Sequence, residues 1–107
     1  MISTDRMEKA LRYLAESDEE AAYHKAHCAR TELQAKSIKN MVFLHSEGTV
    51  AERTAFAESS PEYKDAMENH FESLRAFEQI KNKRSTEAIL IDAWRSLNSS
   101  RNKGNVV

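Results

Sequence analysis

His24 and Cys28 are the residues whose types and spacing come nearest to a chemical site. They lie four positions apart, so a helix would place both on one face, as two ligands of a zinc ion require. Zinc takes about four ligands, and His45 and His70 lie too far along the chain to join this pair within one copy. A metal site would therefore need a dimer. We instead interpret Cys28 as a small buried residue and His24 as a neighbour of Arg84 or Glu87, and we expect no cofactor.

Nucleophilic catalysis by Cys28 with His24 or His27 fits the spacing alone. In the middle of a helix the backbone amides are already hydrogen-bonded, so no donor is left for an oxyanion. The sequence also lacks a glycine-rich phosphate loop and the Glu-x-x-His pattern of di-iron helical bundles. We predict that the protein is not an enzyme. An enzyme or metal protein that uses His24 and Cys28 stays the least favoured alternative.

Basic residues gather near the end of the chain. Residues 80–107 hold six basic and two acidic side chains, whereas residues 1–20 hold three basic and six acidic ones. The cluster predicts contacts with phosphate groups or with an acidic partner, although cations near a helix C-terminus also favour the helix dipole. Trp94 is the one aromatic residue among them, so stacking on nucleic-acid bases is weakly supported. The candidate contact residues are Lys81, Lys83, Arg84, Arg95, Arg101 and Lys103.

Long helices must position these residues, because the chain has only two glycines and one proline. Ser60 and Pro61 provide a helix start, and no Gly or Pro follows before residue 99. We therefore predict one helix over 61–99. Residues 81–87 contain no apolar side chain, so a strict heptad repeat fails there; a break near Ser85 is the alternative.

Capping signals divide the first half of the chain. Asp5 predicts a short helix over 5–16, and the capping box that begins at Ser17 predicts a second over 18–46; one bent helix is the alternative. Gly48 is expected to end the second helix, and Thr49 opens a connecting helix of about 50–58. The second helix carries a heptad-like stripe and a neighbouring stripe. One comprises Ala21, His24, Cys28, Thr31, Ala35, Ile38, Val42 and His45, and its neighbour comprises Ala22, Ala26, Ala29 and Leu33.

These elements predict an all-α fold: an antiparallel hairpin of two long helices with short N-terminal and connecting helices. We expect a single domain over 1–107 with a flexible tail at 99–107. Alanine occurs 14 times, against 20 Val, Ile, Leu and Phe residues together, so the core is thin and homodimerisation is expected. The predicted core comprises Leu11, Leu14, Leu33, Ile38, Val42, Phe56, Met67, Phe71, Leu74, Phe77, Ile91 and Trp94.

The cellular location is predicted from sequence features that the chain lacks. One cysteine excludes an internal disulfide framework and favours a reducing, cytoplasmic location. No apolar run approaches the roughly 20 residues of a membrane span, and residues 1–6 do not resemble a secretory signal. We expect no membrane partner.

Three stretches carry a resemblance to known proteins: residues 9–16 (KALRYLAE), 47–53 (EGTVAER) and 93–99 (AWRSLNS). In these stretches the chain resembles small helical proteins of unassigned function that tailed phages and prophages encode. None of the stretches is a functional motif. The resemblance implies a setting near phage DNA recombination or replication. We therefore predict a non-enzymatic interaction protein without a cofactor, with direct nucleic-acid binding as the alternative.

Overall fold

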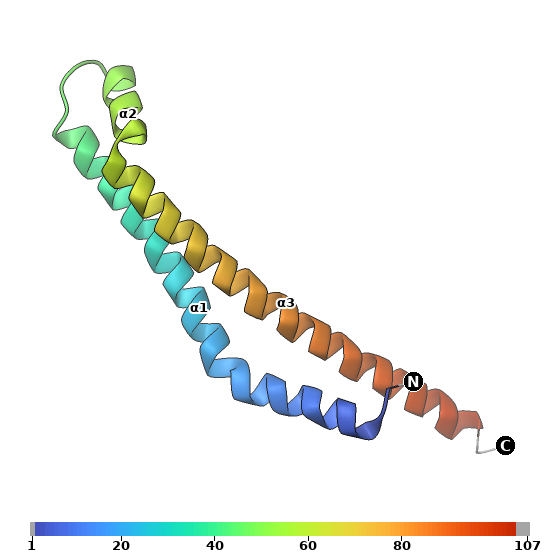
Figure 1. The fold of residues 1–107 in the computed structure, drawn as a ribbon. Helices are drawn as coiled ribbons and strands as arrows, with labels where there is room; N and C mark the ends of the chain where they lie inside the picture. Colours follow the sequence, from blue (N-terminus) through green and yellow to red (C-terminus); the bar gives the residue numbers. More distant parts are fainter. Residues whose placement is uncertain (1, 105–107) are drawn as a thin grey trace. The chain divides into compact units, whose positions relative to one another are not determined.

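The computed structural model describes residues 2–104, which are helical throughout apart from short connections. Three helices follow one another: α1 (Thr4–Leu44), α2 (Val50–Ser59) and α3 (Pro61–Gly104) (Figure 1). No strand occurs in this part of the chain. The predicted all-α fold with two long helices that pack together is confirmed.

The prediction of a separate N-terminal helix is wrong, because α1 runs unbroken from Thr4 to Leu44. Ser17 does not cap a second helix. It is buried, and its hydroxyl accepts a hydrogen bond from Arg84 at 2.7 Å. No Gly or Pro interrupts these 41 residues, so nothing in the backbone ends the helix at Ser17.

The turns follow their predicted signals closely. Thr49 caps α2, and its hydroxyl accepts the Glu52 amide at 3.2 Å. Gly48 has a φ of +116°, a conformation that side chains other than glycine rarely adopt. Ser60 accepts the Tyr63 amide at the start of α3. These three residues fix where the chain leaves one helix and enters the next.

The helix α3 continues through 81–87, as predicted, and its heptad spacing continues too. The buried and half-buried residues of α3 include a line whose members recur at alternating intervals of three and four. They are Tyr63, Ala66, His70, Ser73, Phe77, Ile80, Arg84, Glu87, Ile91 and Trp94. We call the contact line between α1 and α3, to which these residues belong, the seam. The apolar heptad does fail at 81–87, as expected, because the two positions of this line there are the charged residues Arg84 and Glu87.

Contacts divide the chain into two compact units, and each contains segments of α1 and α3. The terminal unit comprises Met1–Ala21 and Gln79–Val107, and the central unit comprises Ala22–Glu78. Each unit is described by itself below.

Small side chains form the seam of the central unit. Ala35 and Ala66 are buried there, together with Cys28 and two hydroxyl residues, Thr31 and Ser73, while Ala57 of α2 is buried elsewhere in the unit. Among the described residues no large side chain is fully buried. Small residues allow close approach of helices but remove little apolar area from water, so larger side chains at the flanks stay partly exposed.

The predicted core is therefore only partly correct. Ile91 is buried, and six others are half-buried: Leu14, Ile38, Val42, Met67, Phe77 and Trp94. The remaining five are exposed, and their assignment to the core is wrong: Leu11, Leu33, Phe56, Phe71 and Leu74. The reason is positional, because smaller neighbours such as Ser73 and Ala66 occupy the seam.

The end of α3 lies at Gly104, so residues 99–104 are helical; the flexibility expected for 99–107 stays a prediction, and 105–107 lie outside the described residues. Within the described residues, none of the helices combines the length and apolar character needed to cross a bilayer.

Candidate functional site

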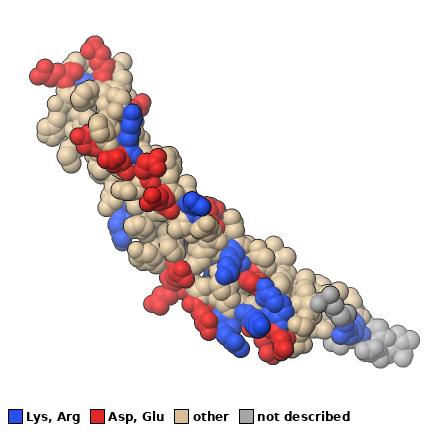
Figure 2. Space-filling model, viewed as in Figure 1, with Lys and Arg blue, Asp and Glu red and all other residues tan. Residues whose placement is uncertain are grey.

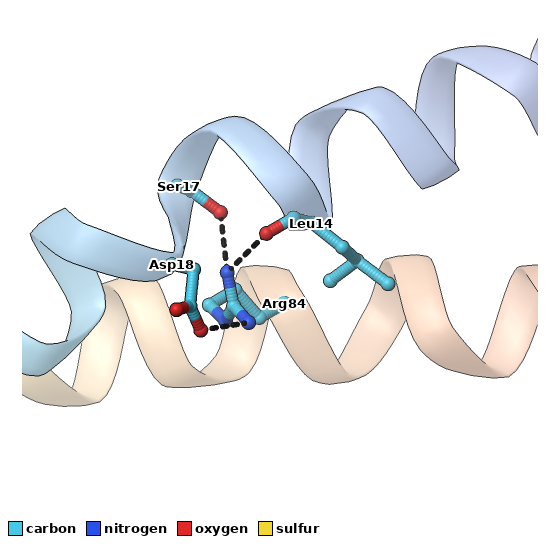
Figure 3. Close-up of polar contacts among 4 residues, drawn as sticks. All are labelled: Leu14, Ser17, Asp18 and Arg84. Atoms are coloured by element: carbon cyan, nitrogen blue, oxygen red, sulfur yellow. Dashed lines mark hydrogen bonds and ion pairs between the residues drawn. The ribbon is translucent and has the colours of Figure 1, made fainter.

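The Arg84 side chain joins α3 to α1 within the terminal unit. Its Nη1 donates to the Leu14 carbonyl at 2.8 Å and to Ser17 Oγ at 2.7 Å (Figure 3). Its Nη2 lies 3.4 Å from Asp18 Oδ1. This arginine occupies a heptad position, so its guanidinium is directed at the neighbouring helix. Our expectation that Arg84 lies near His24 stays a prediction.

Glu87 lies one heptad position further along the seam and pairs with Arg6. The Arg6 Nη2 donates to Glu87 Oε1 at 2.7 Å, while Glu87 Oε2 is buried without a hydrogen-bond partner. The hydrogen bond from Arg6 holds the pKa of the Glu87 carboxyl below its usual range, although burial opposes this shift. The same bond raises the pKa of Arg6. Charged residues thus replace apolar ones in this part of the seam.

The other predicted contact residues lie in the same unit but in different environments. Lys83 Nζ lies 4.5 Å from the centre of the Tyr13 ring. Arg95 is 70% exposed at its side chain and lies 3.9 Å from Asp92. Lys81 and Arg101 are exposed, and the side chain of Lys103 lies outside the described part. The five of these residues whose side chains are described therefore do not converge on one point.

Acidic side chains accompany this basic segment. Residues 1–20, which belong to the same unit, contribute six acids, and two of the observed ion pairs join α1 to α3 there. Figure 2 shows basic and acidic side chains interleaved on the visible face. A polyanion approaching the basic segment would meet both signs of charge, which weakens electrostatic attraction.

The pair His24 and Cys28 lies on α1 in the central unit. Cys28 is buried in the seam, and His24 is half-buried. His45 Nδ1 lies 2.8 Å from the Met41 carbonyl oxygen, and His70 Nδ1 lies 3.1 Å from Thr31 Oγ1. In the described chain, no three His, Cys, Asp or Glu side chains are grouped closely enough to hold a metal ion.

A hydroxyl contact that the sequence did not reveal lies at the centre of this unit. Thr31 Oγ1 and Ser73 Oγ are 2.6 Å apart, and both residues are buried. Thr31 Oγ1 also lies 3.0 Å from the Cys28 carbonyl oxygen and Ser73 Oγ 2.8 Å from the His70 carbonyl oxygen, so one hydroxyl can donate across the contact while the other donates to its own helix. The sequence offered one signal, because Thr31 belongs to the first stripe predicted for the helix over 18–46. Ser73 offered none, because only apolar residues were selected as the packing face of α3.

Two grooves of about 580 and 420 Å³ run along one side of the seam in the central unit. They share Gln34 and Asn69, so they adjoin. The larger groove has Arg30 and Leu33 on α1, with Glu62 and Asp65 on α3. The smaller one contains Tyr23, whose ring stacks on that of His27 with centroids 5.7 Å apart. The mixture of charges and the lack of converging polar groups favour no particular small molecule.

The outer faces of the helices carry the large apolar side chains that the seam does not use. Leu33 is 64% exposed, Phe56 61% and Phe71 50%. At the α2 end, Met41, Leu44 and Val50 are exposed as well. The outer faces are the candidate functional surface, because their large apolar side chains are not covered by the contacts between α1 and α3.

No family model, no curated protein and no solved structure matches this chain.

Proposed function

We propose that the protein is a non-enzymatic helical interaction protein that binds another protein chain through the outer faces of its long helices. The observation that supports this most directly is the exposure of large apolar side chains on α3, among them Phe71 and Leu74, beside a seam of small ones. Burying such side chains against a partner is favourable by about 25 cal/mol per Å² of apolar area.

The accessible surface supports a partner of substantial size. It measures 7973 Å², whereas a folded monomer of 12.2 kDa is expected to expose about 6,100 Å². A standard interface covers about 800 Å² on each partner. The difference of about 1,900 Å² is large enough for such an interface on each copy, so we propose a homodimer.

The two long helices, in this proposal, run antiparallel as a hairpin within each unit. In the central unit Thr31 contacts Ser73 of α3, and Lys39, further along α1, has its Nζ 5.8 Å from the centre of the Tyr63 ring of α3. In the terminal unit Arg6 pairs with Glu87, and Ser17 with Arg84. As the residue number increases along α1, the number of the α3 residue that it contacts decreases, which supports opposite directions for the two helices.

The resemblance to phage and prophage proteins supports a setting for this function. We propose an accessory role in phage DNA recombination or replication, in the cytoplasm, through protein contacts. This part of the proposal rests on the resemblance alone and assigns no role to individual residues.

Light scattering coupled to size exclusion, over a series of concentrations, tests the homodimer. We expect a mass of twice 12.2 kDa at micromolar concentration that falls toward one chain on dilution. A mass of one chain at every concentration up to about 1 mM, where binding is already as weak as about −4 kcal/mol, would refute it.

Direct nucleic-acid binding is the second candidate, and the exposed guanidinium of Arg95 favours it. Titration of single-stranded and duplex DNA at two salt concentrations tests it, because phosphate contacts weaken steeply as salt rises. The variant Lys81→Glu with Arg95→Glu should abolish binding. Absence of binding at low salt would remove this candidate.

A further inference from the structure

The helix α3 carries a second apolar stripe outside the seam, within the central unit. Met67, Phe71 and Leu74 follow one another at intervals of four and three, so they share one face of the helix. Phe71 is 50% exposed and Leu74 36%. The seam takes His70 and Ser73 instead, so this stripe faces away from the contacts that hold the unit together.

Charged residues surround Phe71 in a pattern that is complementary to itself. Lys64 lies seven positions before Phe71, and Glu78 lies seven positions after it. Glu68 lies three positions before, and Arg75 four positions after. Each pair thus joins opposite charges at nearly equal distances from the centre; Lys64, Glu68 and Arg75 are exposed and Glu78 is half-buried.

We infer that a second copy of this chain docks on this stripe, with α3 antiparallel to α3 and the twofold axis at Phe71. This inference rests on the proposed function and specifies its surface. Lys64 then meets Glu78 of the second copy, Glu68 meets Arg75, and Met67 packs on Leu74. Both Phe71 rings pack at the centre, where offset aromatic pairs are favourable.

Helix geometry is consistent with this pairing. Seven residues complete about two turns, so positions 64, 71 and 78 lie along one line over about 21 Å. Met67 and Leu74 lie on one flank of that line, and Glu68 and Arg75 lie on the other. A twofold axis perpendicular to α3 places each flank against the same flank of the second copy. A parallel pairing would instead place Lys64 beside Lys64 and Glu78 beside Glu78, which is repulsive.

The exposed Leu33 on α1 lacks this complementarity. Arg30 lies three positions before it and Lys36 three positions after it. An antiparallel pairing centred on Leu33 would place cations together. Leu33 is therefore a matched control: an apolar side chain of similar exposure on the other long helix.

Charge reversal tests the register directly. Lys64→Glu and Glu78→Lys should each raise the dimer dissociation constant at least tenfold, about 1.4 kcal/mol, because each homodimer then contains two like-charged pairs. An equimolar mixture of the two variants should dimerise again to within about threefold of the original constant, because every pair is once more of opposite sign. Sedimentation equilibrium measures all three constants, and circular dichroism verifies that each variant is folded.

Phe71→Ser and Leu33→Ser complete the experiment. We expect only Phe71→Ser to dissociate the dimer. A mixture of the charge variants that stays monomeric, or equal effects of Phe71→Ser and Leu33→Ser, would overturn this surface. If all the α3 variants dimerise as the original chain does, the surface is wrong while the proposed function stands. If the original chain is monomeric, the homodimer itself fails.

Discussion

Replacement of Arg84 by methionine separates a structural role of this side chain from a role in phosphate binding. The guanidinium donates two hydrogen bonds from Nη1 across the seam, at 2.8 and 2.7 Å. Arg84→Met removes both while it keeps most of the unbranched stem, so the packing of the stem against α1 is largely preserved. The change therefore reports on the polar contacts.

The expected magnitude follows from the partners of Arg84. Hydrogen bonds with a charged donor contribute about 1.5–3 kcal/mol. Asp18 is 82% exposed and adds little as an ion-pair partner, and the Ser17 hydroxyl can bond to its own helix instead. We expect Arg84→Met to lower the free energy of unfolding by about 2 kcal/mol and the Tm by roughly 10 °C.

Urea unfolding followed by circular dichroism measures this loss, at one fixed protein concentration because a dimer's stability depends on it. Arg95→Met is the control, since its exposed side chain should alter stability by less than about 0.5 kcal/mol. A double-mutant cycle with Ser17→Ala should show a coupling of about 1 kcal/mol. The reasoning is refuted if Arg84→Met matches Arg95→Met in stability while both reduce DNA affinity equally.

Three further predictions concern other parts of the chain. Arg6 lowers the pKa of Glu87 from its ordinary 4.5, so this pair should stabilise the fold above about pH 5 and lose its effect as pH falls through the lowered pKa. Urea unfolding midpoints measured from pH 7 down to pH 3 should therefore fall less steeply in Glu87→Gln than in the original chain. Thr49→Ala should cost about 1 kcal/mol in urea unfolding, because it removes the cap of α2; no loss would mean that α2 contributes little to stability. Gly48→Ala should cost at least about 1 kcal/mol in the same assay because its φ is +116°, and an unchanged midpoint would contradict this.

The helix boundaries were the part of the fold that local chemistry predicted best. Thr49, Gly48 and Ser60 act within a few residues of themselves, so their effect is visible without knowledge of the rest of the chain. The continuity of α3 followed in the same way from the absence of Gly and Pro. Ser17 shows the limit of such signals, because its hydroxyl is used between helices rather than at a helix end.

The seam was harder to predict because apolar size is a poor guide to it. Our core assigned Phe71 and Leu74 to the interior, whereas their neighbour Ser73 lies there. Arg84 and Glu87 were invisible as seam residues because a heptad is ordinarily found by its apolar positions. Their role depends on partners more than 60 residues away in the sequence, Ser17 and Arg6, which no local pattern identifies.

In the seam of the central unit, we expect small residues rather than large ones to tolerate substitution least. In most cores the large apolar side chains are the positions that resist substitution, and shortening them leaves cavities. Here Ala35, Ala66 and Ser73 are the restrictive positions, since any added methylene would force α1 and α3 apart. A deep mutational scan for folding alone should thus show intolerance at alanine and serine, and wide tolerance at exposed Leu33. Because most substitutions enlarge alanine and serine, we expect destabilising mutations in this chain to act by overpacking the seam rather than by creating cavities.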